Sequence, residues 1–213
     1  MGMTDAPKFR RRKTARPAEI IEAALSVFAE TGFAAARLDE IARRAGVSKG
    51  ALYLYFETKE DLFRAAVRAA VTPNLEGIRA VAEAFDGPFA QLIPMILTRA
   101  AQAMSVSQLG AVVKMVVGES RNFPDLARIW HDDVVAFMLD LMTGLIERAQ
   151  GRGEVAPGNP RLYAFSLAGP MVMAVLYREV FGGGDGADPP DLQALAAQHA
   201  RTVLHGMLLG EPK

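Results

Sequence analysis

The chain has 213 residues, of which 51% are hydrophobic and 23% are charged, and it contains no cysteine. This composition is typical of a folded globular protein, and the lack of cysteine excludes disulfides, thiolate metal ligands and a cysteine nucleophile. The net charge is zero, but residues 1–59 hold 11 Lys and Arg against 7 Asp and Glu, whereas residues 60–213 hold 13 against 17. A basic end on a neutral chain indicates one segment that faces an anionic partner such as nucleic acid.

Residues 1–16 form a basic segment without helical or strand periodicity. Its basic residues are Lys8, Arg10, Arg11, Arg12, Lys13 and Arg16. No long apolar run follows them, so we do not expect a secretory signal. We expect a flexible arm, which either lies along DNA phosphates or is only a solvated tail.

Residues 17–57 are predicted to form three helices. Pro17 suits the start of the first helix, and Gly32 can end it. Gly46 supplies a residue that adopts positive φ after the second helix, and Ser48 is a good N-cap for the third. Two short helices on a tight glycine turn make a helix-turn-helix, whose second helix can enter a DNA major groove.

Three basic residues stand at predicted helix starts. Lys49 and Lys59 are first residues of helices, Lys59 directly after the N-cap Thr58 of a capping sequence that ends at Asp61, and Arg37 directly precedes another helix. A basic residue there opposes the helix dipole, at a cost of roughly 0.3–1 kcal/mol. Because helix N-termini point N–H groups at anions, we expect these ends to hold DNA phosphates. The alternative is that the three are ordinary solvated side chains.

One sequence pattern runs from Gly32 to Leu62. Its residues are Gly32-Phe33, Ile41-Ala42, Ala45-Gly46-Val47-Ser48-Lys49-Gly50, Leu52-Tyr53, Tyr55-Phe56, Lys59-Glu60 and Leu62. This pattern resembles the DNA-binding domain of the TetR family of bacterial transcriptional regulators. The chain departs from that family at Ala36 and Arg37, where Thr or Ser usually caps the second helix. A lost cap costs about 1 kcal/mol, which a phosphate contact by Arg37 could offset.

The helix-turn-helix and the resemblance together predict the DNA contacts. The expected phosphate contacts are Arg37, Ser48, Lys49, Tyr53, Tyr55 and Lys59. Gly50 and Ala51 lie on the groove-facing side of the third helix, where Ala51 could meet a thymine methyl group.

The remainder of the chain, residues 58–213, shows only helical patterns. We expect six helices, at residues 58–83, 89–104, 107–120, 124–150, 160–181 and 191–209, with a kink at Pro73. The fold class is therefore all-α, with an N-terminal three-helix domain and a C-terminal six-helix domain. The apolar run from Tyr163 to Tyr177 is about fifteen residues long, whereas a bilayer needs about twenty, so we expect a buried or interface helix and no membrane span.

The resemblance implies further properties of the C-terminal domain. The last two helices would form a homodimer as a four-helix bundle, and an effector cavity would lie among the middle helices. Our candidate pocket residues are Met115, Glu119, Phe123, Trp130 and Phe137, although each is more often a structural residue than a ligand contact. The expected function is that of a cytoplasmic repressor, released from a palindromic operator by a small hydrophobic molecule.

Two other functions are considered. A DNA-binding dimer could respond to a protein partner and bind no small molecule. An enzyme is disfavoured, because the chain has three histidines, no cysteine, no nucleophile elbow and no phosphate loop. The run His131-Asp132-Asp133 could suggest a metal site, but adjacent residues of a helix point apart, and an acidic helix N-terminus explains it more simply. We therefore expect no metal and no cofactor.

Overall fold

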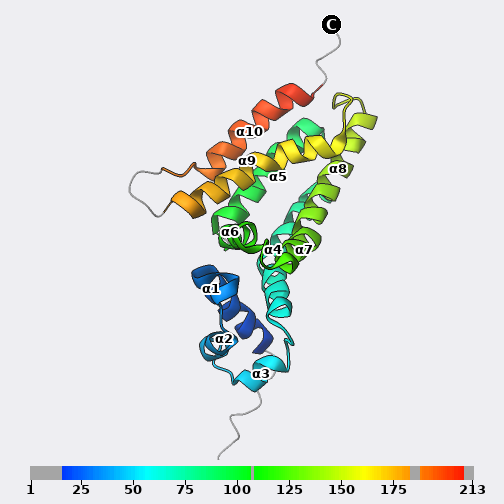
Figure 1. Ribbon diagram of the computed structural model, residues 1–213. Coiled ribbons are helices and arrows are strands. Elements are labelled where there is room, and N and C mark those ends of the chain that lie inside the picture. Colours follow the sequence, from blue (N-terminus) through cyan, green and yellow to red (C-terminus); the bar gives the residue numbers. More distant parts are fainter. Residues whose placement is uncertain (1–15, 107, 183–187, 209–213) are drawn as a thin grey trace, which may run out of the picture. The chain divides into compact units, whose positions relative to one another are not determined.

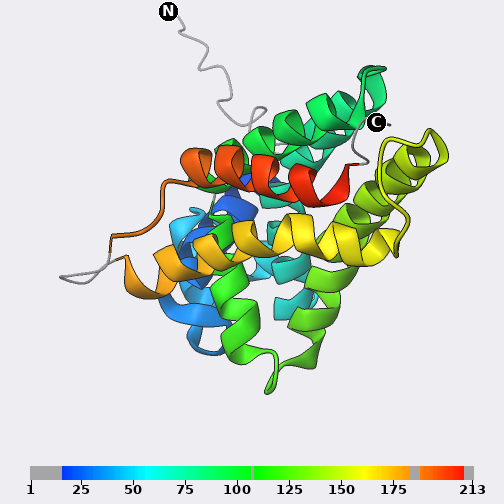
Figure 2. The same cartoon turned by 90° about the horizontal axis from the view of Figure 1, so that it is seen from above.

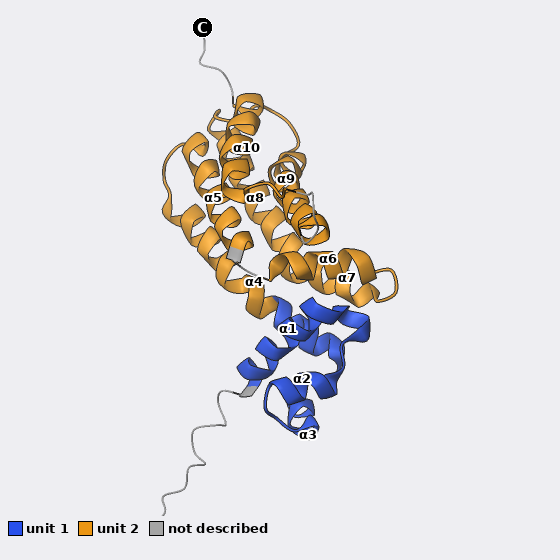
Figure 3. Ribbon diagram, turned by 90° about the vertical axis from the view of Figure 1, so that its left-hand side faces the viewer, with its two compact units in different colours: residues 1–67 blue, residues 68–213 orange. Residues whose placement is uncertain are grey.

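The computed structural model describes residues 16–106, 108–182 and 188–208. These residues are helices and connecting loops, with a single isolated antiparallel bridge between Val155 and Leu208. They form two compact units, residues 1–67 and 68–213 (Figure 3). The predicted all-α fold class is confirmed. The expected arm lies outside the described residues, apart from the backbone of Arg16.

The first unit contains the three predicted helices and the beginning of a fourth. They are α1 (Arg16–Ala35), α2 (Leu38–Arg44), α3 (Lys49–Tyr53) and the first turns of α4 (Lys59–Ala84) (Figure 1). The buried rings of Phe28, Phe33 and Phe63 form the centre of this unit, with centroids 5.6 to 5.7 Å apart. Aromatic rings attract one another at such distances beyond the area they bury, so the three rings hold α1 against the start of α4.

Glycines stand at the two predicted helix ends of this unit. Gly32 interrupts α1 with φ of 77° and ψ of 170°. After α2, Gly46 has φ of 66° and donates its N–H to the carbonyl of Arg43, while the N–H of Val47 reaches the carbonyl of Ala42. This pair of hydrogen bonds is the Schellman motif, which satisfies the last carbonyls of a helix and requires a residue with positive φ. The tight turn of the helix-turn-helix is thus set locally by Gly46.

The caps of the next two helices follow the sequence prediction. The hydroxyl of Ser48 accepts the N–H of Ala51 at 3.1 Å, which caps α3. Before α4, the N–H of Asp61 donates to the Thr58 hydroxyl at 3.0 Å, and the N–H of Thr58 donates back to the Asp61 carboxylate at 3.2 Å. This reciprocal arrangement is a capping box. As expected, Arg37 makes no side-chain cap for α2.

A network of exposed ion pairs joins α1 to α2. Arg44 lies 2.6 Å from Glu30 and 2.7 Å from Glu40, and Glu40 also pairs with Arg43. Hydrogen bonds from Arg43 and Arg44 lower the pKa of Glu40 to about 2. Each exposed pair contributes little alone, but the shared arginine makes them a link between two helices.

The second unit contains the six predicted helices. They are the rest of α4, α5 (Phe89–Val106), α6 (Leu109–Glu119), the run of α7 (Pro124–Trp130), the π-helix η1 (His131–Val135) and α8 (Ala136–Gly151), then α9 (Pro160–Phe181) and α10 (Leu192–Met207). Because α7, η1 and α8 follow without a break, they count as the single long helix that was predicted. Figure 2 shows α9 and α10 side by side, and α10 also packs on α5. Buried apolar side chains of α4, α5, α8, α9 and α10 form the core.

Helix α9 has the predicted bounds, residues 160–181. It has 22 residues, and by length and composition alone it could cross a membrane, although only 28% of its most apolar window is buried within the chain. Length alone therefore does not exclude a bilayer for this helix, and the expectation of a buried or interface helix stays a prediction. Its exposed apolar side chains recur three or four residues apart along much of the helix, which puts them on one face. We call this face the α9 stripe, and its members are Leu162, Phe165, Gly169, Val172, Met173 and Val180.

The π-helix places an acidic residue against α4. Asp133 accepts two hydrogen bonds through Oδ1, from Nε of Arg68 at 3.1 Å and from Nη2 of Arg68 at 2.7 Å. The Asp133 side chain is only 10% exposed, and its Oδ2 has no hydrogen-bond partner among the described residues. The His131-Asp132-Asp133 run lies in the middle of a helix, so its explanation as an acidic helix N-terminus is wrong.

Removal of either partner of this ion pair should have unequal effects. Arg68→Ala leaves a nearly buried carboxylate without a counter-ion, which we expect to cost about 2 kcal/mol in the free energy of unfolding. Asp133→Asn leaves only an exposed arginine, so we expect less than half that loss. Urea denaturation of the full chain measures both values. The double variant should be no less stable than Arg68→Ala alone, and equal losses from the two single variants would contradict this account.

Candidate nucleic-acid interface

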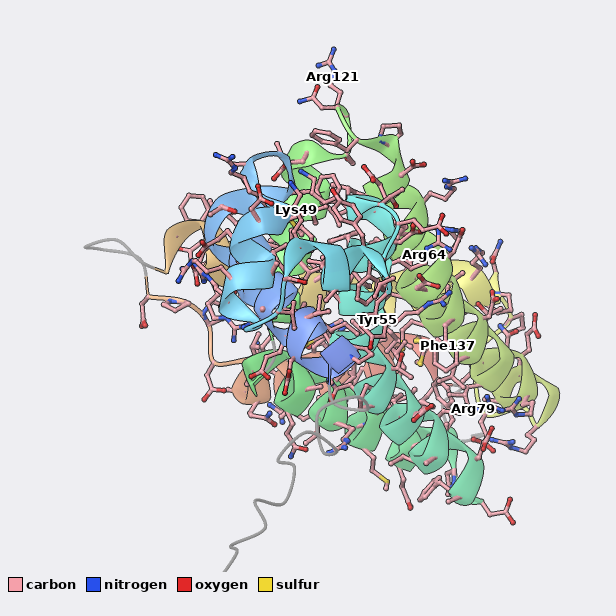
Figure 4. All side chains as sticks on the ribbon, turned by 90° about the horizontal axis from the view of Figure 1, so that it is seen from below. Lys49, Tyr55, Arg64, Arg79, Arg121 and Phe137 are labelled. Carbon is pink, nitrogen blue, oxygen red and sulfur yellow. The ribbon has the colours of Figure 1, made fainter. Side chains whose placement is uncertain are left out.

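The third helix, α3, presents the predicted DNA-binding side chains to solvent. Leu52 is buried and fixes the inward face of the helix, and Phe56 is buried just after it. The opposite side is open: the predicted contacts Ser48, Lys49, Gly50, Tyr53 and Tyr55 are exposed, and Ala51 is half-buried. Figure 4 looks onto this part of the molecule and labels Lys49 and Tyr55. The buried pair thus leaves one side of α3 available for a major groove.

Lys49 has a partner within the same unit. Its ammonium lies 2.8 Å from Oδ1 of Asp39, and both side chains are more than half exposed. The hydrogen bond between them raises the pKa of Lys49 and lowers that of Asp39. A DNA phosphate that binds Lys49 therefore has to compete with the Asp39 carboxylate.

Arg37 remains available as a phosphate contact. It is exposed at the residue before α2, close enough to Asp39 and Lys49 to affect the pKa of each. Because it forms no cap, its side chain is not needed to satisfy the helix. The position of Arg37 beside Lys49 agrees with the predicted cluster of positive charge.

Lys59 has a structural role that sequence reasoning missed. Its ammonium donates to three backbone carbonyls, those of Phe33 at 2.7 Å, Ala34 at 3.2 Å and Ala36 at 3.2 Å. It also lies 4.5 Å from the centre of the Phe33 ring. A cation is favourable at the carbonyl end of a helix, and here the three carbonyls accept all three N–H donors of the ammonium. This geometry gives the Lys59 ammonium a role in joining α1 to α4, and its phosphate contact stays a prediction.

Two comparisons with known proteins cover most of the chain. Residues 20–66 match the family model described as bacterial regulatory proteins of the tetR family, and residues 93–199 match the model described as a tetracyclin repressor-like C-terminal domain. The transcriptional repressor BepR of Brucella suis is 34% identical over 158 residues, which are 68% of this chain and 73% of BepR.

The chain belongs to the TetR family.

Two solved structures of transcriptional regulators have the same fold. A TetR-family transcriptional regulator from Mesorhizobium loti superposes with a TM-score of 0.76 at 22% identity, covering 94% of this chain and 100% of that one. The regulator FadR of Bacillus subtilis, solved in complex with stearoyl-CoA, has a TM-score of 0.74 at 21% identity, covering 89% and 98%. The family models and the similarity to BepR make the chain a DNA-binding transcriptional regulator with a helix-turn-helix, and not an enzyme.

The five candidate effector residues occupy the middle of the TetR-type C-terminal domain. Met115 is buried in α6, and Glu119, Phe123, Trp130 and Phe137 are half-buried between α6 and α8. A cavity of about 250 Å³ lies elsewhere, between the end of α4, the beginning of α5 and the end of α8, and none of the five lines it. Its volume is slightly below the usual range for ligand pockets. The candidate pocket thus stays a prediction.

Sequence reasoning also missed two exposed residues of the helix-turn-helix. Asp39 was not among the predicted contacts, and its pairing with Lys49 depends on how α2 and α3 pack. Leu54 was not among the predicted contacts either, although its side chain is exposed. Its offset from the buried Leu52 by two positions could have shown this, since residues two apart face different sides of a helix.

Removal of the Asp39 charge should strengthen DNA binding. Asp39→Asn frees the Lys49 ammonium and removes a negative charge that faces the phosphates, so we expect affinity for a non-specific duplex to rise by up to about fivefold at low salt. Fluorescence anisotropy across a salt series measures this. Glu83→Gln is the matched control, since it removes one exposed, ion-paired carboxylate from the second unit. An Asp39→Asn affinity at or below the wild-type value would contradict the competition between Asp39 and phosphate.

Proposed function

We propose that the chain is a homodimeric repressor that binds a palindromic operator and is released by a hydrophobic small molecule. The observation that carries the proposal is the exposed side of α3, where Lys49, Tyr53 and Tyr55 surround two small residues, Gly50 and Ala51. Lysine and tyrosine side chains hold phosphates, and small residues let the helix backbone approach base edges. A single short helix contacts few bases, so specific binding requires two half-sites and two copies of the helix.

The α9 stripe supports dimerisation. An apolar face of this length is uncommon on a monomer, and the accompanying Gly169 leaves open space in which a partner helix can approach closely. On α10, the exposed Ala194 and Ala197 provide a second surface of small side chains. Other small and apolar residues of these two helices, such as Val175 and Ala196, are buried in the core of the unit and serve the monomer.

A small-molecule effector is supported by the nature of the second unit. Its centre is built from apolar residues, and methionine and aromatic side chains such as Met115, Trp130 and Phe137 can adjust around an apolar ligand. FadR of Bacillus subtilis, which shares the fold, has been solved with stearoyl-CoA. We infer that an effector of this chain is hydrophobic or amphipathic. Effector and operator then weaken each other by the same factor, because they favour different states of one dimer.

The alternative keeps the DNA-binding dimer and replaces the small molecule by a protein partner. The two differ in their response to an apolar dye such as 8-anilinonaphthalene-1-sulfonate. If the dye binds the dimer and operator DNA releases it, a small-molecule site coupled to DNA exists. If the dye does not bind, or if operator DNA does not change its binding, the alternative with a protein partner is favoured.

The operator can be sought in the DNA that flanks the gene of this protein, by mobility shift across a salt series. We expect one palindromic site, bound tightly at low salt and more weakly as salt rises. Lys49→Ala and Tyr53→Ala should each weaken binding by about fivefold or more, since each removes phosphate contacts from both half-sites. Lys114→Ala is the matched control, because Lys114 lies on α6 and bonds the backbone of Glu179. Equal behaviour of all three variants would contradict the assigned DNA-binding face.

Disruption of the α9 stripe should give a monomer. Phe165→Asp places a charge within the stripe, and burial of an unpaired charge at a dimer interface costs several kcal/mol. Sedimentation equilibrium should therefore report a dimer for the wild type and a monomer for the variant, and the variant should lose operator binding. Val117→Asp is the control, because Val117 is an exposed apolar residue of α6 outside the stripe. A Phe165→Asp dimer as stable as the wild type would show that the interface lies elsewhere.

A further inference from the structure

Leu54 is the most exposed large hydrophobic residue in the part of the chain that the structure describes. Its side chain is 83% exposed. The residue directly follows α3, and its φ of −71° and ψ of −19° continue the helical turn. The neighbouring apolar residues Leu52 and Phe56 are both buried.

Leu54 lies on the same side of α3 as Gly50. Each helical residue advances by about 100°, so Leu54 stands about 200° from the buried Leu52 and about 40° from Gly50. A Cβ atom added at Gly50 would meet nothing within 4 Å, so this side of the helix is open. Leu54 is thus the one long apolar side chain on a face that is otherwise backbone and small residues.

The charges nearby orient this face toward DNA. Lys49 stands at the first residue of the same helix, and Tyr53 and Tyr55 flank Leu54 with exposed side chains. Residues that hold phosphates at both ends of the helix bring the face between them to the floor of the major groove. On that floor, the C5-methyl group of thymine is the apolar group that a base pair offers.

We propose that Leu54 is a specificity residue, which contacts the methyl group of a thymine in each operator half-site. Ala51 has similar chemistry and had been expected to make such a contact, but it is half-buried and its side chain is shorter. Leu54 reaches farther from the helix axis and is fully available. The inference rests on the proposed binding of a palindromic operator.

The test removes the methyl group from the DNA and the leucine from the protein. Wild-type protein selects its site from a random duplex library, and the enriched palindrome is synthesised with each symmetric thymine pair replaced by deoxyuridine, which keeps base pairing and lacks only the methyl group. At one thymine position we expect the affinity of the wild-type protein to fall about fourfold for each half-site. This is the change in affinity that corresponds to the loss of one buried methyl-sized group. For Leu54→Ala the same replacement should have no effect.

Two controls separate this role from a general effect on binding. Leu54→Met keeps an apolar side chain of similar reach and should keep the sensitivity to deoxyuridine, and Leu54→Ala should match wild type on a non-specific duplex. Deoxyuridine effects that are equal for wild type and Leu54→Ala at every thymine would overturn the inference alone. A selection that enriches no sequence would overturn both the inference and the proposed operator binding.

Discussion

The DNA-binding unit depends on the hydrogen bonds between the ammonium of Lys59 and the backbone carbonyls at the end of α1. The ammonium donates hydrogen bonds to three backbone carbonyls of residues 33–36, after the break of α1 at Gly32, and it lies over the Phe33 ring. Lys59 is also the first residue of α4, so this one side chain joins the end of the first helix to the beginning of the fourth. The chain between these points contains the whole helix-turn-helix. With its two ends held together, burial of Leu52 is sufficient to turn the other side of α3 outward.

The outward side of α3 combines opposed features in a small area. Lys49 supplies positive charge, Asp39 reduces it, and Leu54 adds apolar surface. Positive charge alone would bind any DNA, because phosphates carry no sequence information. A carboxylate that competes for the lysine lowers non-specific affinity, and an apolar side chain responds to base identity. The face is therefore suited to discriminate between sequences and not only to bind strongly.

Features encoded by near neighbours in the sequence could be predicted, and features that depend on distant residues could not. Gly46, Ser48 and Thr58 act on backbone groups within a few residues, so the turn and both caps follow from the sequence. Lys59 bonds residues more than twenty positions earlier, and its sequence environment suggested only an exposed helix start. The pairing of Lys49 with Asp39 likewise depends on the packing of two helices. The candidate effector residues were chosen by type, and residue type alone does not locate a pocket.

The π-helix between α7 and α8 limits which insertions and deletions the sequence can accept in this region. Its backbone bonds, such as that from the N–H of Ala136 to the carbonyl of His131, enclose one more residue than an α-helical turn. The extra residue shifts the phase of the long helix by about 100° between its two halves. Leu126 and Ile129 before the shift and Leu139 and Met142 after it are all buried. Substitutions within residues 131–135 can keep this register, but deletion of a single residue there would rotate one half of the helix out of the core.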